Sequence, residues 1–327
     1  MSSTRQKLIQ LLQENDTKYI SGQYLSDKLN ISRTAIWKHM NELKKDGYVI
    51  EGKANRGYRI ISYPNKVSEN TVRWNLQTEW LGKHVVHYES VPSTQPVAHK
   101  LAQNGASHGT VVIANEQTEA RGRMDRPWYA NTDKGMWLSI VIRPTIPPYI
   151  APQLTLLTAT VLAEVLADEV GVQAQIKWPN DLLINGKKVA GILTEMQAEQ
   201  DQIQYVIIGI GLNVNQTRED FVDEVAHRAT SLFVETNKEW DLVPLIQRIL
   251  EKFEAKYTEY IADGFHQVKK TWEDYGFKLH ETIEIKTGKE RWKGVFLGVA
   301  EDGALLAKRI CDQVVKKVYS AEIAWFD

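Results

Sequence analysis

The sequence has few of the features that mark secreted and membrane proteins. Cys311 is its one cysteine among 327 residues, so an internal disulfide is excluded. No apolar run approaches the roughly 18 residues that a membrane-spanning helix needs. Residues 1–7 lack the apolar stretch of a signal peptide, and we find neither low-complexity segments nor internal repeats. We therefore expect a globular protein of the cytoplasm with no membrane partner.

Several short motifs that identify common sites are also missing. The chain has no P-loop, no Gly-x-Ser-x-Gly and no His-Glu-x-x-His. The segment 209–211 is Gly-Ile-Gly, but Val214 stands where a dinucleotide fingerprint has its third glycine. His84 and His87 have no obvious third metal ligand nearby, so they do not predict a zinc site. The chemistry must therefore come from less general motifs.

Charge is distributed unevenly along the chain. Residues 1–65 contain 11 Lys or Arg and 6 Asp or Glu, which gives +5, whereas the remainder carries −6. A basic head on an acidic body is typical of a domain that binds a polyanion. Small domains also vary by a few charges at random, so the charge alone does not decide this point.

The first 65 residues predict a winged helix-turn-helix. Apolar residues at helical spacing predict three helices, and two alternating runs around a basic, glycine-containing loop predict a β-hairpin. The expected elements are helices at 6–14, 22–29 and 33–46 and strands at 48–50 and 58–60. Ser32 precedes the third helix as its N-cap, and Gly47 follows as its terminator.

In this motif class the N-terminal half of the third helix enters the major groove of DNA, and the wing lies beside the phosphates. The expected DNA-binding residues are Ser32, Arg33, Thr34, Trp37 and Lys38 on the helix and Lys53 and Arg56 on the wing, where Arg59 adds a further cation. Winged helices also mediate protein contacts, but basic residues on both elements favour DNA.

After a linker at 62–66 the pattern changes to strands and amphipathic helices, which predicts an α/β or α+β domain. The expected strands are 110–114, 136–142 and 205–212, and the expected helices are 152–169 and 242–253. Beyond residue 276 the helical pattern ends, and short alternating runs at 282–286, 291–297, 304–308 and 314–319 predict a small β-barrel.

One candidate site is the loop 117–128, which lies between two predicted strands. It places three arginines within six residues, beside Gly122 and before Trp128. Guanidinium groups that a loop holds in place suit phosphate or carboxylate oxygens, and Trp128 can stack on a flat ring. Taken alone, the pattern also fits a solvated basic loop.

A second candidate is the segment 177–193. Its Asn185-Gly186 pair between apolar runs predicts a two-residue hairpin turn, in which Leu183 faces Lys188. Asp181 then shares a face with Lys188 as a diagonal neighbour. Both charges would cost desolvation energy on an apolar hairpin unless they serve a function, and Gly191 allows close approach of a ligand. An ordinary cross-strand ion pair is the alternative.

Together, these segments resemble those of biotin protein ligases of the bifunctional type, which also repress transcription of biotin-biosynthesis genes. The resemblance is carried by segments 93–95, 121–128, 177–181, 186–193 and 209–213. It implies a multidomain α+β fold: an N-terminal winged helix-turn-helix, a central mixed-sheet α/β domain similar to class II aminoacyl-tRNA synthetases, and a C-terminal SH3-like β-barrel. The expected domains are 1–65, 66–275 and 276–327.

The resemblance implies a reaction in two steps. The carboxylate of biotin attacks the α-phosphate of ATP, giving biotinyl-5′-AMP and pyrophosphate, while Mg²⁺ bridges the phosphates. A lysine of the biotin carrier domain of acetyl-CoA carboxylase or pyruvate carboxylase then receives the biotinyl group. Because two anions must meet, the reacting atoms need cations around them. The candidate cations are Arg121, Arg123, Arg126 and Lys188.

The resemblance also assigns roles to individual residues. The expected catalytic residues are Lys188, Asp181 and Arg123, of which Asp181 orients or deprotonates the acceptor lysine. The expected biotin-binding residues are Ser93, Thr94, Gln95, Gln117, Arg121, Gly122, Arg123, Lys188 and Gly191. The expected nucleotide-binding residues are Arg123, Arg126, Trp128, Asn180, Lys188 and Asn213, with Trp128 covering the adenine.

The chain departs from the family pattern within the arginine loop. Ala120 and Asp125 stand where the family usually has glycine, and Met124 and Pro127 also distinguish this loop. If position 125 needs a positive φ, aspartate is among the few tolerated replacements. These departures bear on how tightly the loop holds the adenylate.

Repression implies operator DNA as a partner. It also implies a homodimer, because each winged helix reads one half-site and a palindromic operator has two half-sites. In the family biotinyl-5′-AMP promotes the dimer, and we expect the accompanying loop ordering at 121–128 and 226–232. Two alternatives stay open: a repressor that senses biotin or its adenylate without turnover, and a ligase for a related acyl group such as lipoate.

Overall fold

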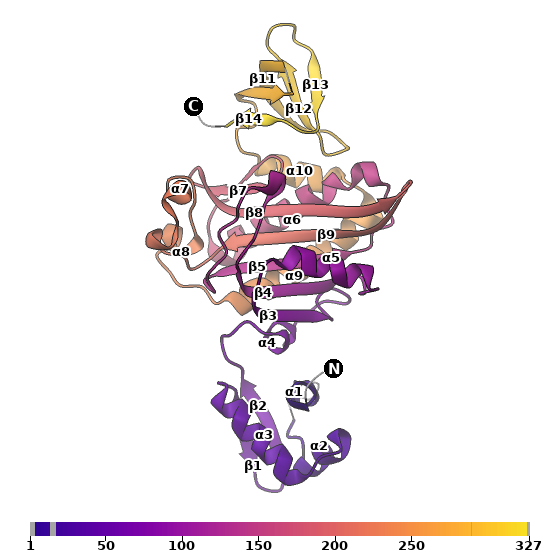
Figure 1. The fold of residues 1–327 in the computed structure, drawn as a ribbon, viewed down its shortest axis with the longest axis vertical. Helices are drawn as coiled ribbons and strands as arrows, with labels where there is room; N and C mark the ends of the chain where they lie inside the picture. The colour runs from indigo at the N-terminus through magenta and orange to yellow at the C-terminus, as the bar shows by residue number, and fades with distance from the viewer. Residues whose placement is uncertain (1–3, 14–17, 289, 326–327) are drawn as a thin grey trace. The chain divides into compact units, whose positions relative to one another are not determined.

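The computed structural model describes residues 4–13, 18–288 and 290–325 (Figure 1). The chain forms two compact units, Met1–Leu76 and Gln77–Asp327. The division into three domains at 65 and 275 stays a prediction. Residue 14, where we expected the first helix to end, and residues 1–3 and 326–327 lie outside the described part.

The first unit contains the predicted helix-turn-helix and hairpin. Its elements are α1 (Thr4–Gln13), α2 (Gly22–Leu29), α3 (Arg33–Lys45), β1 (Val49–Lys53) and β2 (Gly57–Ser62). The strands pair antiparallel, as the alternating pattern predicts. The hydroxyl of Ser32 accepts the backbone N–H of Ala35 at 3.1 Å, so the expected N-cap is confirmed.

This unit extends beyond residue 65, to Leu76. The short helix α4 (Glu69–Arg73) lies close to α1, where the Gln13 side-chain amide donates to the backbone oxygen of Asn70 at 3.3 Å. Trp74 is 6% exposed and belongs to the same apolar cluster as the three helices. Its ring lies 5.2 Å from that of Tyr63. The segment predicted as a linker is therefore followed by chain that packs on the helices.

The second unit is built on a mixed sheet with seven strands among the described residues. Their spatial order is β3 (Val85–Val91), β4 (Thr110–Gln117), β5 (Gly135–Ile142), β9 (Gln202–Asn213), β8 (Lys187–Glu199), β7 (Asp181–Ile184) and β6 (Gln175–Lys177). Only the β3–β4 pair is parallel. The predicted strands at 110–114, 136–142 and 205–212 are confirmed as parts of β4, β5 and β9.

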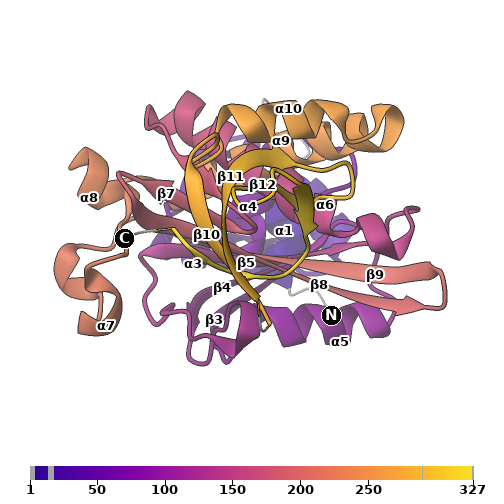
Figure 2. The same ribbon diagram turned by 90° about the horizontal axis from the view of Figure 1, so that it is seen from above.

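Helices cover both faces of this sheet (Figure 2). One face carries α5 (Thr94–Gln103), and the other carries α6 (Pro152–Val165), α9 (Leu242–Asp263) and α10 (His266–Asp274). Two short helices, α7 (Asp223–Ala226) and α8 (Leu232–Thr236), follow β9. The sequence pattern predicts α6 and most of α9, but neither α5 nor α10.

The helical segment Pro148–Val170, which includes α6, has 23 residues, and an 18-residue stretch of it has a mean hydropathy of 1.6. By length and composition it could cross a membrane, so our expectation that no apolar run approaches this length was wrong. Of that stretch, 72% is buried within the fold. That burial is typical of a core helix, which is apolar all round because protein surrounds it.

The C-terminal segment forms a second, antiparallel sheet of five strands within the described residues. Their spatial order is β13 (Val315–Val318), β12 (Leu305–Arg309), β11 (Glu290–Val299), β10 (Thr282–Thr287) and β14 (Glu322–Ala324). Four of these strands match predicted runs, and β14 is additional. The ring of Trp272 on α10 meets Phe296 on β11 at 6.1 Å, which joins this sheet to the helical layer.

The β7–β8 hairpin positions the residues of the second candidate site. Asn185 and Gly186 form its turn with φ of 50° and 74°, and Leu183 pairs with Lys188 as predicted. The register then shifts by one residue at Val189, so that Asp181 pairs with Gly191.

This β-bulge changes the direction of side chains along β8. Residues 188 and 191 are three apart, and regular alternation would point them to opposite faces. Because the bulge inserts one residue, Lys188 and Gly191 face the same side as Asp181. A Cβ atom on Gly191 would lie 3.2 Å from Lys188 Nζ. The sequence does not reveal this bulge.

Gly57 provides a test of how the wing attaches to its helices. Tyr58 and Ile20 exchange two backbone hydrogen bonds of 2.8 and 2.9 Å, and a Cβ on Gly57 (φ +112°) would lie 1.9 Å from the Ile20 oxygen. We expect Gly57→Ala to lower the free energy of unfolding of this unit by about 3 kcal/mol. In the control Gly52→Ala the new Cβ meets its nearest neighbour at 3.6 Å. Equal urea midpoints for the two variants would contradict this prediction.

Candidate active site

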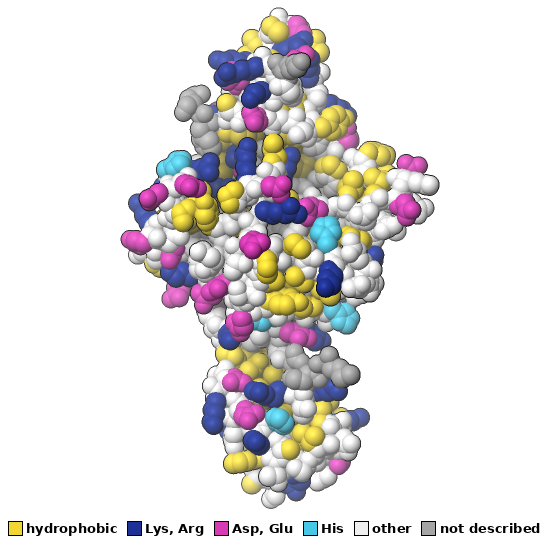
Figure 3. Space-filling model, viewed as in Figure 1, with side chains coloured by type: hydrophobic (Ala, Val, Ile, Leu, Met, Phe, Trp, Pro, Cys, Tyr) yellow, Lys and Arg dark blue, Asp and Glu magenta, His cyan; other side chains and the backbone are white. Residues whose placement is uncertain are grey.

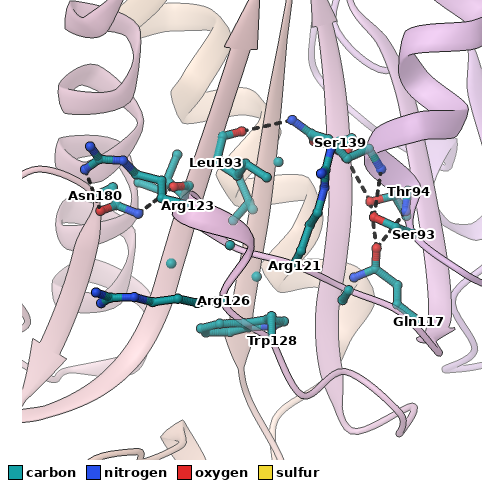
Figure 4. A pocket seen from close by; sticks show the side chains of 18 of the residues that line it. Ser93, Thr94, Gln117, Arg121, Arg123, Arg126, Trp128, Ser139, Asn180 and Leu193 are labelled. Atoms are coloured by element: carbon teal, nitrogen blue, oxygen red, sulfur yellow. Dashed lines mark hydrogen bonds between the residues drawn. The ribbon is translucent and has the colours of Figure 1, made fainter.

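A cavity of about 140 Å³, here called the inner chamber, lies at the sheet where α5 begins and where β5, β8 and β9 run side by side (Figure 4). Thirteen of the predicted site residues line it: Ser93, Thr94, Gln95, Gln117, Arg121, Gly122, Arg123, Arg126, Trp128, Asn180, Asp181, Lys188 and Gly191. The structure therefore brings together five segments that are up to about a hundred residues apart in sequence.

One side of the inner chamber is a buried network of hydrogen bonds. Gln117 Oε1 accepts from the backbone N–H of Thr94 at 2.7 Å and from its hydroxyl at 3.1 Å. The Thr94 hydroxyl lies 2.8 Å from that of Ser139, which donates to Gln95 Oε1 at 2.9 Å. Gln95 Nε2 donates to the Leu193 oxygen at 3.2 Å. This side can offer donors and acceptors to a polar ring.

The opposite side of the chamber is cationic. Figure 4 shows Arg123 and Arg126 pointing away from Thr94 and Gln117. Arg123 Nη1 donates to Asn180 Oδ1 at 3.4 Å, and the Asn180 amide donates to the Ile192 oxygen at 2.8 Å. Burial lowers the pKa of Arg123 from its usual value, although a guanidinium remains protonated in proteins.

Asp181 is paired with two lysines. Its carboxylate lies 2.7 Å from Lys188 Nζ and 2.9 Å from Lys177 Nζ. Burial alone would raise the pKa of Asp181, but the ammonium groups of Lys188 and Lys177 outweigh burial and hold it below the usual 3.8. The predicted contact of Asp181 with Lys188 is confirmed, and the second partner, Lys177, is new.

Two glycines allow Trp128 to lie against the sheet. A Cβ on Gly211 would lie 2.7 Å from the Trp128 indole, and one on Gly191 would lie 3.2 Å from it. The Trp128 ring also lies 5.0 Å from Lys188 Nζ, a cation–π contact. Its Nε1 is buried and has no hydrogen-bond partner among the residues described. An unpaired buried donor at a cavity wall points to an acceptor on a ligand.

The arginine loop is a small hairpin. The backbone N–H of Trp128 donates to the Ala120 oxygen at 2.9 Å, and that of Gly122 donates to the Arg126 oxygen at 2.8 Å. At its tip Asp125 has φ of +54°, as its replacement of a glycine suggests, and Met124 has φ of +57°. Ala120 is not among the residues with positive φ, so that position has no backbone need for glycine.

A larger cavity of about 610 Å³, the outer cavity, adjoins the inner chamber. The two share Arg126, Pro127, Trp128, Asp181 and Lys188 as a common wall. The outer cavity also contacts the C-terminal sheet at residues 323–325 and the segment 221–229. Figure 3 shows Lys and Arg side chains around this hollow.

Asn213 lines the outer cavity, whereas the other predicted nucleotide residues line the inner chamber or both cavities. Asn213 is 4% exposed, and its amide donates to the Thr230 oxygen at 2.9 Å, which ties β9 to the segment before α8. The side chain therefore also shapes the wall of the cavity.

Several lining residues were not among the predicted site residues. Leu193, Gly209 and Gly211 of the inner chamber lie in segments that carry the family resemblance, and His227 and Arg228 of the outer cavity lie in the segment 226–232 where we expected ordering. Sequence reasoning did not single out Ser139, Tyr129, Phe221 or Trp325. The Gly-x-Gly pattern inside a strand was a usable signal, because glycine in a strand marks close approach of another group. The outer-cavity residues depend on loop packing that no local pattern shows.

The predicted DNA-binding residues lie on the surface of the first unit. Ser32, Arg33, Thr34, Trp37 and Lys38 are exposed at the start of α3, as is Arg56 on the wing. Two wing cations are less available than expected, because Glu51 lies 3.3 Å from both Lys53 Nζ and Arg59 Nη2. Binding of phosphate by these two cations must compete with that pairing.

Family models match both units. A model of the Biotin/lipoate A/B protein ligase family matches residues 88–213, a range that includes every residue lining the inner chamber, and a model of the HTH domain matches residues 4–59. The biotin protein ligase from Aquifex aeolicus in complex with biotin and ATP superposes with a TM-score of 0.63 at 28% identity, covering 74% of this chain and 98% of that one. Fold and chamber thus define a protein ligase of the biotin/lipoate class.

Full-length relatives narrow this class. The bifunctional ligase/repressor BirA of Bacillus subtilis (strain 168) is 45% identical over 322 residues, which cover 98% of both chains. The protein of the same name from Escherichia coli (strain K12) is 26% identical and covers 97% of this chain and 96% of its own. The chain belongs to the family of bifunctional ligase/repressors.

The pairing of Asp181 predicts a pH-dependent stability. Asp181→Asn removes the charge at nearly constant volume, and we expect it to lower the free energy of unfolding by about 2–3 kcal/mol at pH 7. Because the folded state lowers the pKa of this carboxyl, its contribution is present above pH 4 and is lost as the pH falls below 3.8. Denaturant titrations at pH 7 and pH 3 check this, and a difference between wild type and variant that stays constant with pH would refute it.

Proposed function

We propose that the chain is both a biotin protein ligase and a repressor of biotin biosynthesis and transport genes. It forms biotinyl-5′-AMP from biotin and ATP, and transfers biotin to a lysine in the carrier domain of biotin-dependent carboxylases. One observation supports this above all: a polar inner chamber and a larger outer cavity meet at a wall that contains Lys188 and Arg126. Two anionic substrates can meet there.

Biotin would occupy the inner chamber. Its ureido ring needs both donors and acceptors, which the network of Thr94, Gln95, Gln117 and Ser139 offers. Ser93 and the backbone of the arginine loop complete the proposed site, together with Lys188 and Gly191. The carboxylate at the far end of the molecule would then lie toward the cationic side.

ATP would occupy the outer cavity with its α-phosphate at the shared wall. Trp128 would cover the adenine, and its unpaired Nε1–H offers a donor. Asn213, Asn180, Arg123 and Arg126 complete the proposed nucleotide site. When a biotin carboxylate oxygen attacks the α-phosphorus, a P–O bond forms, the bond to the β-phosphate oxygen breaks, and pyrophosphate leaves.

The cations have the electrostatic role in this step. Lys188, held by Asp181 at 2.7 Å, offers its remaining N–H groups to the carboxylate and phosphate oxygens. Arg123 offers a second positive charge. Preorganised charges stabilise the transition state because they need not reorient.

In the transfer step the neutral acceptor amine attacks the acyl carbon, AMP leaves, and one proton must be removed. Asp181 has a pKa below the usual value and is therefore a weak general base. We assign it the role of orienting Lys188 and attracting the acceptor ammonium group. This choice favours one of the two roles that the family resemblance leaves open.

Mg²⁺ accompanies ATP in this proposal. No group of three or more His, Cys, Asp or Glu that could hold a metal ion was found among the described residues. Asp181, which lines both cavities, already pairs with two lysines. The phosphates would therefore supply the ligands of the ion, and its chemistry would be to offset phosphate charge.

The first unit would bind operator DNA through α3 and the wing. A dimer promoted by biotinyl-5′-AMP would place two such units on a palindromic site. We further propose that residues 276–327 form an SH3-like barrel and that the central domain is similar to class II aminoacyl-tRNA synthetases. We also propose that the protein is cytoplasmic and has no membrane partner. Its acceptors would be the carrier domains of acetyl-CoA carboxylase and pyruvate carboxylase.

Lipoate is the main alternative acyl group. Its dithiolane ring has no amide donors or acceptors, so it would leave the buried polar network of the inner chamber unmatched, at a cost in affinity. Sensing without turnover is the other alternative, and the retained Lys188–Asp181 pair disfavours it. Competition between biotin and lipoate for adenylation distinguishes the acyl groups.

We expect Lys188→Ala to reduce biotin-dependent exchange of pyrophosphate with ATP by at least about 100-fold, because no other group replaces the cation at the reacting oxygens. Lys187→Ala is the matched control: Lys187 neighbours Lys188 on β8 but lines neither cavity. Near-normal exchange in Lys188→Ala, with an unchanged thermal unfolding midpoint, would refute the assignment.

We expect Arg56→Ala to weaken operator binding and to reduce the slope of log K against log salt by about 1, since one phosphate contact is lost. Pyrophosphate exchange should be unaffected. Lys269→Ala, on α10 of the second unit, serves as the charge-matched control. A salt slope equal to that of the control in fluorescence anisotropy titrations would remove Arg56 from the interface.

A further inference from the structure

We propose that Trp37 reads thymine in each half-site of the DNA, through contact of its indole ring with the C5-methyl group of that base in the major groove. Trp37 is then a residue that determines sequence specificity, whereas the cations around it bind phosphate. The inference deepens the proposed function and rests on it, because it takes operator DNA as the partner of the first unit. It adds which base is recognised and by which chemical group.

The indole lies outside the apolar stripe that packs α3 into its unit. Ile36, Met40 and Leu43 form that stripe and are 0%, 1% and 2% exposed, whereas Trp37 is 58% exposed. Successive residues of a helix are rotated by about 100°, so Trp37 points away from the direction in which Ile36 is buried. The core therefore does not account for an indole at this position, and most of its apolar surface is available to a partner.

The side chains around Trp37 indicate the charge of that partner. Arg33 and Thr34 lie one turn before it on the same face of α3, Lys38 is its neighbour, and all three are exposed. The helix contains one acidic residue, Glu42, whose carboxylate turns toward α1 and lies 3.8 Å from Arg5 Nε. A single exposed apolar residue needs no explanation, but one among cations fits an anionic surface that has an apolar group within it.

The major groove of DNA is such a surface. Phosphates line its edges, and the C5-methyl of thymine is the one apolar group that base pairs present on its floor. Thymine also presents the O4 acceptor beside this methyl and has no donor in the groove. An indole has an apolar ring and an N–H that donates but cannot accept. Its chemistry therefore matches thymine, whereas adenine and cytosine present amino donors and guanine has no methyl group.

The position of Trp37 along α3 agrees with this role. The Ser32 cap begins the helix at Arg33, so Trp37 lies about one turn from the N-terminus. In helix-turn-helix proteins the N-terminal residues of the recognition helix contact the edges of bases. Contacts to phosphate fix the register of a protein on DNA but carry no sequence information. The cations of this face thus position the helix, and the indole contributes the specificity.

Deoxyuridine tests the proposal directly, because it differs from thymidine only by lacking the methyl group. The full-length protein, with biotin and ATP present, first selects duplexes from a random-sequence library. In the most enriched duplex, deoxyuridine then replaces thymidine at one position at a time. We expect one or two positions in each half-site at which this change weakens binding by wild type about three- to five-fold in fluorescence anisotropy, the effect of leaving one methyl group unburied.

Three variants assign this preference to a residue. Trp37→Ala should weaken binding of the selected duplex by about ten-fold or more, and should bind the thymidine and deoxyuridine duplexes equally. Trp37→Phe keeps an apolar ring and should retain the preference for thymidine. Lys38→Ala is the matched control on the same face: it should reduce the slope of log K against log salt by about 1 and keep the full preference. Unfolding midpoints equal to that of wild type check that the variants are folded.

Two outcomes overturn the proposal: a selected duplex in which no thymidine is sensitive to loss of its methyl group, or a preference for thymidine that persists in Trp37→Ala. In the second case Trp37 affects DNA binding through the protein, for example through self-association, and does not read the base. Failure of the proposed function looks different. If wild type enriches no duplex from the library, the repressor assignment fails, and the role of Trp37 fails with it.

Discussion

The contact of Lys188 with Asp181 is the interaction on which the rest of the site depends. It holds an ammonium group at the junction of two cavities, beneath the ring of Trp128. A buried carboxylate beside a single lysine would give a locally neutral pair, but Lys177 adds a second cation, so the cluster stays positive. Burying such charges costs folding energy, which is tolerated where the charge serves anionic substrates.

The architecture separates recognition from chemistry. Uncharged groups on α5, β4 and β5 form one side of the inner chamber, and charges on the arginine loop and the β7–β8 hairpin form the other.

Much of this structure could be predicted from the sequence, since local signals were strong. The Ser32 cap, the Asn185-Gly186 turn and the core strands follow from side-chain chemistry and periodicity, and the arginine loop from its composition. Ser139 was missed because its strand is otherwise apolar, and Lys177 because its pairing depends on the register of β6 and β7. The outer cavity requires that the C-terminal sheet meet the central one, which no local pattern encodes.

The β-bulge at Val189 decides which side of the sheet the ammonium group reaches. Lys188 and Gly191 are three residues apart, and they share a face only because one extra residue lies between their pairing positions. If β8 kept its length but paired with β7 without the bulge, one of the two would lie on the opposite face. The local geometry of a few residues on β8 thus has as much influence on the chemistry as the side chains that carry the charges.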